Sequence, residues 1–309
     1  IIINQINSLV KNGGEISLFT IKSGIYNYLK SIFTLRKVIR KNTFEILHAH
    51  YGWCGVVTFL ADRNTPLIIS FMGDDLMGVV GKKGHYSIPG KLVVAINIFF
   101  AKFFFDFSIV KSKALENKLK GVSNTAIIPN GVDVMNFIPK QREAAKKKIQ
   151  LNPDYQYIIW VSDPLRNEKN FRLAKNAVAL LNQPDIRLLP VYNMPVDNLI
   201  WYYSAADCLL LTSFHEGSPN VIKEAMACNL PIVSTDVGDV KWIIGKTKGC
   251  YVTSFDPNDV ADKLKKALLF RKQRGNTDGR SKLIQLGLDS DSIALQIIKL
   301  YKNVLLDSK

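Results

Sequence analysis

The sequence has few cysteines, few histidines and no long uninterrupted apolar run. Its four cysteines form no C-x-x-C pair, which excludes a disulfide-built secreted mini-fold and favours reduced thiols in a cytoplasmic protein. The longest apolar run, residues 92–110, contains Lys102 and Asp106, and charges inside such a run argue against a transmembrane helix. Low-complexity tracts and short repeats are also absent, so the chain is neither fibrous nor disordered.

Acidic residues are scarce relative to basic ones, and this predicts an acidic partner. The 309 residues include 41 Lys+Arg and 26 Asp+Glu, a net charge of +15, and residues 1–140 alone carry 17 basic and 8 acidic side chains. The surplus in the first half predicts contact with an anionic membrane surface, while the plainer alternative is a set of solvated lysine faces. Nucleic acid is not expected, because no RNP, KH or zinc-finger pattern is present.

Short apolar, β-branched runs alternate with helical periods along the chain. The alternation predicts α/β architecture: two doubly wound Rossmann-like domains, each a parallel sheet with helices on both faces, facing each other across a cleft. The expected strands are 15–21, 44–48, 66–71, 107–110 and 125–129 in the first half and 157–161, 186–191, 208–211, 231–234 and 250–252 in the second.

The Asn130-Gly131 turn lies between these two sets of strands and predicts the domain junction. We expect a first domain over 1–133, a second over 134–287, and a C-terminal helix over 288–309 that packs back on the first domain. The chain opens directly on a helical pattern at 4–11, so we expect the first sheet to lack a strand that would precede it.

The most informative stretch runs from Ser213 to Ala227, between an expected strand and an expected helix. Its Gly-Ser-Pro-Asn loop would leave backbone N–H groups at a helix N-terminus, which is a ready anion site. Glu216 precedes the loop, and Glu224 follows it within the helix. Two acceptors flanking a phosphate cradle suit a nucleotide sugar, whereas the alternative is a capped helix with solvent-facing glutamates.

This stretch resembles the E-x7-E signature of retaining glycosyltransferases of family 4, which have the GT-B fold. Four further segments resemble the same family in the same order, namely 128–133, 205–207, 231–233 and 236–239. The likeness covers nearly the whole chain and is greatest to bacterial members that build surface polysaccharides. It implies transfer of a sugar from a nucleotide-diphosphate sugar to a hydroxyl of a glycan or lipid-linked glycan.

The resemblance also implies roles for residues that match the motif. Glu216 would contact the donor sugar near the reacting carbon, and Glu224 would bind the ribose hydroxyls. The sugar and the diphosphate would be held by the loop between them, which consists of Gly217, Ser218, Pro219, Asn220 and Val221. Members of this family generally need no metal in the site, so we expect no cofactor beyond the nucleotide-sugar substrate.

Two cations follow the expected strand 157–161 and could meet the diphosphate. Lys169 lies where a helix opens, and Arg166 lies three residues earlier. The family usually places an arginine at the position of Pro164, so Arg166 is interpreted as a displaced substitute. The alternative is that both are ordinary surface charges at a helix start.

In the first domain, His48 and His50 end one expected strand, and Gly73 and Asp74 end the next. The resemblance implies that His50 lies by the donor phosphate and the acceptor, with His48 structural and Gly73 and Asp74 on the acceptor side. The alternatives for the histidines are two packed side chains or a zinc pair, and zinc is the weaker of these because further ligands are lacking. For Asp74 the alternative is a helix N-cap.

Three other functions remain compatible with this architecture: a nucleotide-sugar epimerase of GT-B shape, a catalytically inactive membrane-associated scaffold, and a two-domain solute receptor, which would normally carry a secretion signal. For the leading reading we expect a cytoplasmic enzyme, peripheral on the inner face of the membrane. The residues expected to face the membrane are a basic cluster of Arg36, Lys37, Arg40 and Lys41, the loop 81–85 and the apolar segment 92–105.

Overall fold

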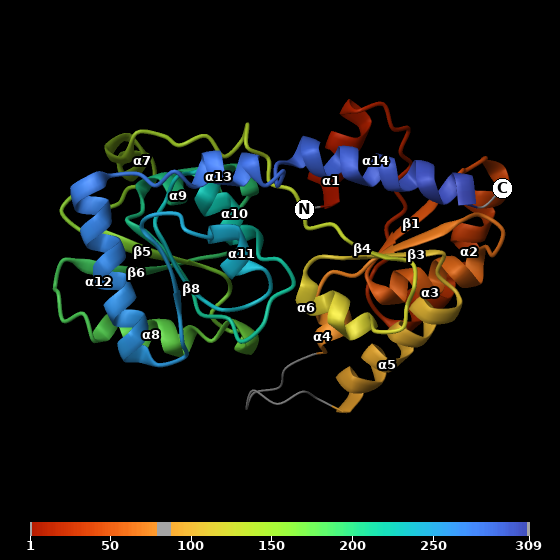
Figure 1. Cartoon of the computed structure of the whole chain (residues 1–309), viewed down its shortest axis with the longest axis horizontal. Coiled ribbons are helices and arrows are strands. Elements are labelled where there is room, and N and C mark those ends of the chain that lie inside the picture. Colours follow the sequence, from red (N-terminus) through yellow and green to blue (C-terminus); the bar gives the residue numbers. More distant parts are fainter. Residues whose placement is uncertain (1, 79–87, 308–309) are drawn as a thin grey trace. The chain divides into compact units, whose positions relative to one another are not determined.

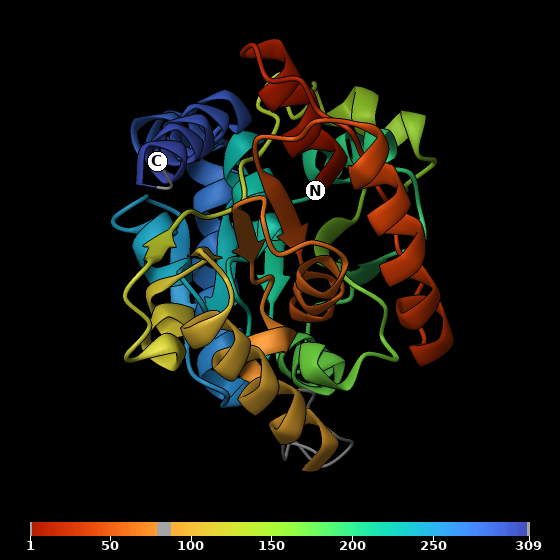
Figure 2. The ribbon, with the colours of Figure 1, turned by 90° about the vertical axis from the view of Figure 1, so that its right-hand side faces the viewer.

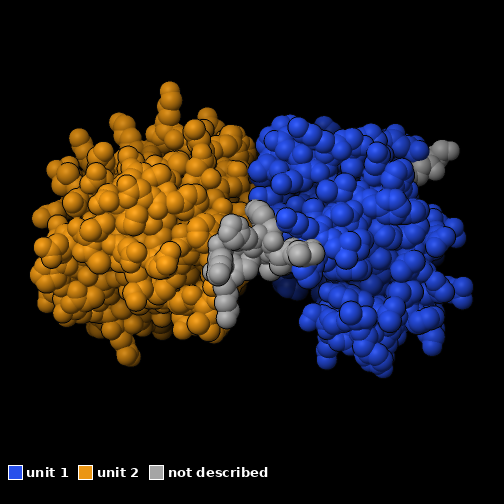
Figure 3. Space-filling model, turned by 90° about the horizontal axis from the view of Figure 1, so that it is seen from below, with its two compact units in different colours: residues 1–80, 85–130, 291–309 blue, residues 81–84, 131–290 orange. Residues whose placement is uncertain are grey.

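The computed structural model describes residues 2–78 and 88–307, which form two compact units (Figure 3). The described part of unit 1 is 2–78, 88–130 and 291–307, and that of unit 2 is 131–290. The chain therefore passes from unit 1 into unit 2 after Asn130 and returns after Ser290. The sequence placed these two boundaries at 133/134 and 287/288.

Unit 1 contains a sheet flanked by helices (Figures 1 and 2). The sheet is parallel, with strand order β1-β2-β3-β4. Its strands are β1 (Leu47–His50), β2 (Leu67–Ser70), β3 (Phe107–Val110) and β4 (Thr125–Ile127). Strand β2 is buried along its whole length, as expected of an inner parallel strand covered on both faces. The carboxyl ends of β1 and β2 are in register, with His50 opposite Ser70.

The helices of unit 1 are α1 (Ile2–Lys11), α2 (Ile25–Lys41), α3 (Gly52–Ala61), α4 (Asp74–Met77), α5 (Ile88–Phe103), α6 (Lys113–Glu116) and most of α14 (Ser290–Asp307), with a 3₁₀ turn η1 (Asn117–Leu119). Helix α14 contacts the sheet of unit 1 through Tyr301, whose hydroxyl lies 2.6 Å from His48 Nδ1. The last helix of the chain thus belongs to the unit formed by its first residues.

Unit 2 contains a five-stranded parallel sheet in the order β6-β5-β7-β8-β9. The strands are β5 (Gln156–Val161), β6 (Ile186–Val191), β7 (Cys208–Leu211), β8 (Ile232–Thr235) and β9 (Cys250–Thr253). The chain runs from β5 to β6 on one side and then returns to place β7 on the other side of β5. The strand order therefore reverses between β5 and β7, and ligands of open α/β sheets bind outside the carboxyl ends at such a reversal.

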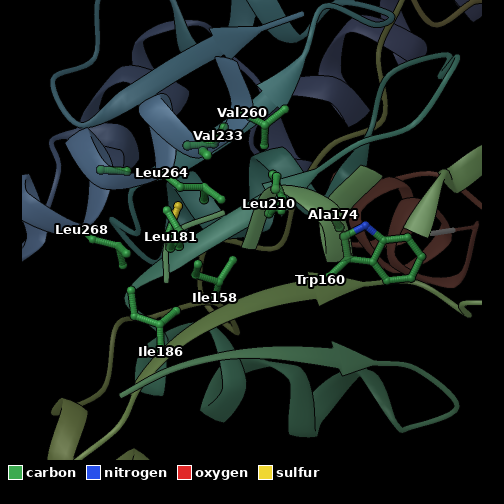
Figure 4. Packing of buried hydrophobic residues seen from close by; sticks show 14 of the residues in the cluster. Ile158, Trp160, Ala174, Leu181, Ile186, Leu210, Val233, Val260, Leu264 and Leu268 are labelled. Atoms are coloured by element: carbon green, nitrogen blue, oxygen red, sulfur yellow. The ribbon is translucent and has the colours of Figure 1, made fainter. Parts of the chain in front are cut away.

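The helices of unit 2 are α7 (Arg142–Lys148), α8 (Phe171–Ala179), α9 (Val196–Ala205), α10 (Asn220–Ala227), α11 (Val240–Ile244), α12 (Pro257–Arg274) and α13 (Gly279–Gln285), with a 3₁₀ turn η2 (Asn167–Lys169). One core cluster joins β5, β7 and β8 to α8 and α12; it includes Ile158, Leu210, Val233, Ala174 and Leu264 (Figure 4). This packing fixes the strand ends that carry the loops described below.

Nine of the ten expected strands are present, with ends shifted by at most a few residues. The exception is 15–21, where the prediction of a strand is wrong. This segment pairs with no described strand, and its apolar side chains Ile16 and Leu18 are 38% and 54% exposed. The alternating apolar pattern of this segment has the period of a strand, but the segment does not pair with an edge strand of the sheet.

The described residues include no helix that is both long enough and apolar enough to cross a bilayer. The four cysteines are unpaired thiols.

Candidate functional site

Lys169 and Glu216 meet at the point where the strand order of unit 2 reverses. Lys169 ends η2 after β5, and Glu216 follows β7. Lys169 Nζ lies 2.5 Å from Glu216 Oε1, and both side chains are largely buried. Ser213 Oγ donates to the same carboxylate oxygen at 2.7 Å. The structure thus brings together two predicted site residues that are 47 positions apart.

Threonine hydroxyls fix the loops that carry this pair. Thr212 Oγ1 lies 2.9 Å from the carbonyl oxygen of Lys169 and accepts from Trp160 Nε1 at 3.0 Å. Thr235 Oγ1 donates to the carbonyl of Ser213 at 2.8 Å. Because β5, β7 and β8 are joined through side chains as well as through the sheet, the ion pair rests on a rigid support.

A buried network lies behind the 217–221 loop. Lys223 Nζ donates to Ser218 Oγ at 2.6 Å, and Ser218 Oγ donates to Asp239 Oδ2 at 2.5 Å. Lys223 is fully buried. Gly238, with φ +60°, allows the β8–α11 loop to approach, since a Cβ there would lie 2.7 Å from the Gly217 carbonyl oxygen. Lys223 was not predicted from the sequence, although helical spacing places it one turn before the buried Ala227.

Burial dominates the titration of this network. It lowers the pKa of Lys223 to about 8, although Asp239 and Glu224 oppose the shift. Burial also raises the pKa of Asp239, against the opposing effects of Lys223 and the Ser218 hydrogen bond. The ammonium and the carboxylate therefore depend on each other for charge compensation, and losing either would leave the other charge buried.

Helix α10 begins at Asn220, directly after the loop. Pro219 is the N-cap residue and provides no side-chain cap, so the first N–H groups of the helix keep their capacity to bind an anion. The side-chain oxygen of Asn220 is buried and has no hydrogen-bond partner among the described residues. Ser218, Pro219, Asn220 and Val221 thus line the start of a helix whose dipole favours negative charge.

Glu224 lies in α10 and is held by a residue that the sequence analysis did not select. The hydroxyl of the fully buried Tyr203, on α9, donates to Glu224 Oε2 at 2.6 Å. Burial raises the pKa of Glu224, and the hydrogen bond from Tyr203 partly offsets this effect. The phenol therefore fixes the orientation of the carboxylate.

Arg166 differs from Lys169 in its surroundings. Its guanidinium lies 2.5 Å from Glu168 Oε1, and half of its side chain is exposed. Its partner in the ion pair is therefore Glu168, a residue that was not predicted from the sequence. The structure therefore does not bring Arg166 into direct contact with Glu216.

In unit 1, His48 and His50 stack with ring centroids 4.6 Å apart. His48 is bound on both sides, by Tyr301 and by Ser70 Oγ at 2.8 Å, whereas His50 Nδ1 is buried without a hydrogen-bond partner among the described residues. Burial and the nearby Lys111 lower the pKa of His50 to about 3. His50 is therefore a neutral imidazole that can hydrogen-bond but is a weak base.

The acidic residue organising the β2–α4 loop is Asp75 rather than Asp74. Asp74 is exposed, and Gly73, not Asp74, occupies the N-cap position of α4. Asp75 is buried, and its carboxylate accepts from the amides of Gly73 at 2.9 Å, Met72 at 3.0 Å and Gly52 at 3.3 Å. Asp75 thus ties the loop after β1 to the loop after β2. Because Asp74 and Asp75 are adjacent and identical in type, the sequence does not indicate which of the two is buried.

Metal ligands do not gather in the part of the chain that the structure describes: no three His, Cys, Asp or Glu side chains are placed to hold an ion.

The fold and the loop at the strand reversal define a protein of the GT-B class. A model of glycosyltransferase family 4 matches residues 9–135, and one of glycosyl transferases group 1 matches residues 191–269. The chain thus contains one segment that matches glycosyltransferase family 4 and another that matches glycosyl transferases group 1.

Among its relatives, a Bacillus subtilis (strain 168) protein named as a teichuronic acid biosynthesis glycosyltransferase, TuaC, is 23% identical over 227 residues, which cover 65% of this chain and 56% of that protein. The chain thus spans little more than half the length of this relative. Sucrose-phosphate synthase from Thermosynechococcus elongatus has a similar structure, with TM-score 0.78 at 18% identity over 95% of this chain and 82% of that one. Anabaena HepE, solved with UDP and glucose, has TM-score 0.71 at 16% identity over 96% and 88%.

Proposed function

We propose that this protein is a retaining glycosyltransferase that moves a sugar from a nucleotide-diphosphate sugar to a hydroxyl of a glycan or lipid-linked glycan in bacterial surface polysaccharide synthesis. The observation that carries the proposal is the Lys169–Glu216 pair at the strand reversal of unit 2, directly before the N-terminus of α10. Structures of HepE with UDP and with UDP-glucose support a nucleotide-sugar donor. The name of TuaC supports a surface glycan product.

In this proposal the donor binds to unit 2. The diphosphate lies at the first amides of α10, and the Lys169 ammonium meets its charge as a compact cation. Glu224, oriented by Tyr203, accepts hydrogen bonds from the ribose hydroxyls. Glu216 accepts from hydroxyls of the sugar near the anomeric carbon.

The reaction then breaks the bond between the anomeric carbon and the diphosphate oxygen, and the electron pair stays on the diphosphate. The acceptor hydroxyl oxygen attacks the same face of the anomeric carbon, and its proton passes to an oxygen of the leaving diphosphate. The protein supplies position and a fixed field: Lys169 and the α10 amides stabilise the negative charge as it develops. Because protein cations meet this charge, we propose that no metal is required, and turnover should be unchanged in EDTA.

Unit 1 is proposed to bind the acceptor. His50 is neutral at physiological pH, so it orients an oxygen by hydrogen bonding rather than removing its proton. Gly73 and Asp74 lie at the start of α4, after the carboxyl end of β2, and Asp74 is exposed. We propose that both lie on the acceptor side of the site.

Release of nucleoside diphosphate in the presence of acceptor tests the proposal. A thermal-shift screen of nucleoside diphosphates and then of their sugars selects the donor, because ligand binding to the folded state raises stability by mass action. Donor isomerisation without diphosphate release would identify an epimerase. Tight donor binding with no product in any acceptor mixture would identify an inactive binding protein.

We also propose that unit 1 associates with an anionic membrane at its cytoplasmic face. Helix α2 exposes apolar side chains, Tyr26 at 74% and Phe33 at 64%, beside the exposed Lys37, Arg40 and Lys41. Helix α5 exposes further apolar side chains, which are Leu92, Phe99 and Phe103. Arg36 is a correction to the predicted basic cluster, since its guanidinium binds the carbonyls of Leu60 and Ala61. The predicted contact loop 81–85 lies outside the described residues.

Vesicle sedimentation tests the membrane proposal. Phosphatidylglycerol vesicles should retain the protein at low salt and release it at high salt, because the Debye length falls from about 10 Å at 0.1 M to about 3 Å at 1 M. Charge reversal at Lys37, Arg40 and Lys41 should abolish retention. Reversal of Lys265, Lys266 and Lys272 on α12 is the matched control and should not. Equal recovery with phosphatidylcholine vesicles would refute the proposal.

A further inference from the structure

Tyr51 has a backbone conformation that side chains rarely adopt. It lies between β1 and α3 with φ 70° and ψ 139°. Six non-glycine residues with positive φ occur in the described chain, and four of them are asparagines, which tolerate this region. Tyr51 is the aromatic one. Strain of this kind persists only where the surroundings impose it, and it occurs preferentially at functional sites.

Buried neighbours impose this conformation. The Tyr51 amide donates to the Ser70 carbonyl at 3.0 Å, and the Tyr51 carbonyl accepts from the Gly55 amide at 3.1 Å to start α3. The next residue is fixed by Asp75, whose carboxylate accepts from the Gly52 amide.

Asn97 closes the turn from the side of α5. A Cβ on Gly52 would lie 2.2 Å from the Asn97 side chain, so only glycine fits there. Asn97 is fully buried, and its Nδ2 donates to the Asp75 carbonyl at 2.8 Å. Asp75 and Asn97 therefore hold the Tyr51–Gly52 turn in one conformation.

Tyr51 is 49% exposed although its backbone is fixed. It stands at the carboxyl end of β1, directly after His50. Glycine would adopt this backbone without strain, so the strain is a cost of carrying a side chain here. A flat apolar ring with a polar tip, carried on a fixed backbone at the ligand edge of a sheet, suits a partner that has both an apolar face and peripheral hydroxyls.

We propose that the Tyr51 ring is a stacking platform for a hexopyranose of the acceptor. The proposal rests on the proposed function and adds a subsite to it. The C–H-rich face of the sugar covers the ring, and this leaves the sugar hydroxyls free to reach polar groups such as His50. The fixed turn means that little conformational freedom of the backbone is lost on binding.

Four variants test the proposal: Tyr51→Phe, Tyr51→Ala, Tyr51→Gly and, as control, Tyr26→Ala, which removes another exposed tyrosine of unit 1. Binding is measured by saturation-transfer NMR titration with methyl glycosides of glucose, galactose and N-acetylglucosamine. We expect Tyr51→Phe and Tyr26→Ala to bind the sugar as the natural protein does. Tyr51→Ala and Tyr51→Gly should bind about 2- to 12-fold more weakly, the range for loss of one aromatic contact.

Thermal unfolding of the same variants separates a binding role from a structural one. Tyr51→Gly should melt above Tyr51→Ala, because glycine relieves the backbone strain that alanine retains. A large fall in melting temperature for Tyr51→Gly would show that the ring supports the fold and would overturn the proposal.

Three binding results would also overturn it. They are no saturation transfer from the natural protein to any methyl glycoside, unchanged binding by Tyr51→Ala, or equal losses for Tyr51→Phe and Tyr51→Ala, which would assign the effect to the hydroxyl. Failure of the proposed function is seen separately, as absence of nucleoside diphosphate release by the natural protein.

Discussion

At the scale of single residues, the Glu216 carboxylate is the group whose charge the candidate site depends on most. Glu216→Gln keeps the volume and the hydrogen bond from Ser213 but loses the charge that faces Lys169. We expect turnover to fall by about 10²–10³-fold with the fold retained, a loss typical of one preorganised polar group at a reacting centre.

Steady-state release of nucleoside diphosphate measures the effect of Glu216→Gln. Glu143→Gln, on the exposed surface of α7, is the matched control and should leave turnover unchanged. Near-normal turnover of Glu216→Gln would remove Glu216 from the reacting centre.

The two stacked histidines make unit 1 sensitive to acid. Burial lowers the pKa of His48 well below 6.5 and that of His50 to about 3. Below pH 6.5 the unfolded chain therefore takes up protons that the folded unit does not, and stability falls as the pH decreases toward 3. The slope should approach about 1.4 kcal/mol per pH unit for each histidine.

Hydrogen exchange of β1 and β2, corrected for the intrinsic pH dependence of exchange, measures this slope between pH 7.5 and pH 5 (roughly one and a half pH units below the ordinary histidine pKa). His50→Gln should remove about half of the slope. An unchanged slope in that variant would assign the acid sensitivity to other groups.

Sequence alone predicts which residue types form the site but not which of them touch. Glu216 and Lys169 could be selected from their motifs, yet their contact depends on β5 and β7 being neighbours. Asp75, Lys223 and Tyr203 were missed for a different reason. Their roles follow from burial, and the sequence does not distinguish a buried lysine or aspartate from an exposed one.

At the scale of elements, Arg36 joins α2 to α3. Its guanidinium donates to the carbonyls of Leu60 at 2.5 Å and Ala61 at 3.1 Å, the last two residues of α3. Arg36→Ala should lower the stability of unit 1 by about 1–3 kcal/mol, because the hydrogen bonds from a charged donor to two carbonyls at the end of α3 are lost. Arg40→Ala, on the exposed side of the same helix, should change it by less than about 0.5 kcal/mol.

Urea denaturation followed through Trp53, the tryptophan of unit 1, compares the two variants. Equal stabilities for Arg36→Ala and Arg40→Ala would mean that the contact with α3 contributes nothing measurable.

The β8–α11 loop lies close to the backbone carbonyls of Glu216 and Gly217. This approach predicts that a side chain at position 238 would disturb the site. In Gly238→Ala the new Cβ would lie 2.7 Å from the Gly217 carbonyl oxygen, so the loop must shift. We expect kcat/KM for the donor to fall by about 10- to 100-fold, as displacements of a fraction of an ångström to 1 Å do in positioned sites.

Gly275→Ala is the control for Gly238→Ala. Gly275 also has positive φ, +77°, but a Cβ there meets nothing within 4 Å. Its strain should reduce stability and leave donor kinetics unchanged. Similar kinetics for both variants would exclude a role for the loop approach.

The strands were predictable because buried parallel strands are short, largely apolar runs, and β2 and β7 are of this kind. Segment 15–21 has an alternating apolar pattern that also suits a strand, but it pairs with no described strand. Strand order could not be read from composition, because it depends on which edge of β5 each crossover returns to.

At the scale of the whole molecule, α14 makes unit 1 discontinuous in sequence. Its buried side, including Ile297, Leu300 and Val304, and the Tyr301–His48 hydrogen bond attach it to unit 1. Tyr301→Phe should lower the stability of unit 1 by about 1–3 kcal/mol, because a buried imidazole loses its partner, and leave unit 2 unchanged.

Hydrogen exchange of the strands of each unit distinguishes these effects. Tyr192→Phe, an exposed tyrosine of unit 2, should alter neither unit. If Tyr301→Phe accelerated exchange, relative to the natural protein, more in β5–β9 than in β1–β4, the assignment of α14 to unit 1 would be contradicted.

This discontinuity has a consequence for synthesis on the ribosome. Translation completes the contiguous segment 131–290 of unit 2 before the residues of α14 that close unit 1 emerge. At about 5–20 residues per second, the earlier strands of unit 1 wait roughly 10–30 s for the helix that covers them. The unit whose chain is made first is therefore the last to be complete, and its uncovered sheet is the surface that a nascent-chain chaperone would encounter.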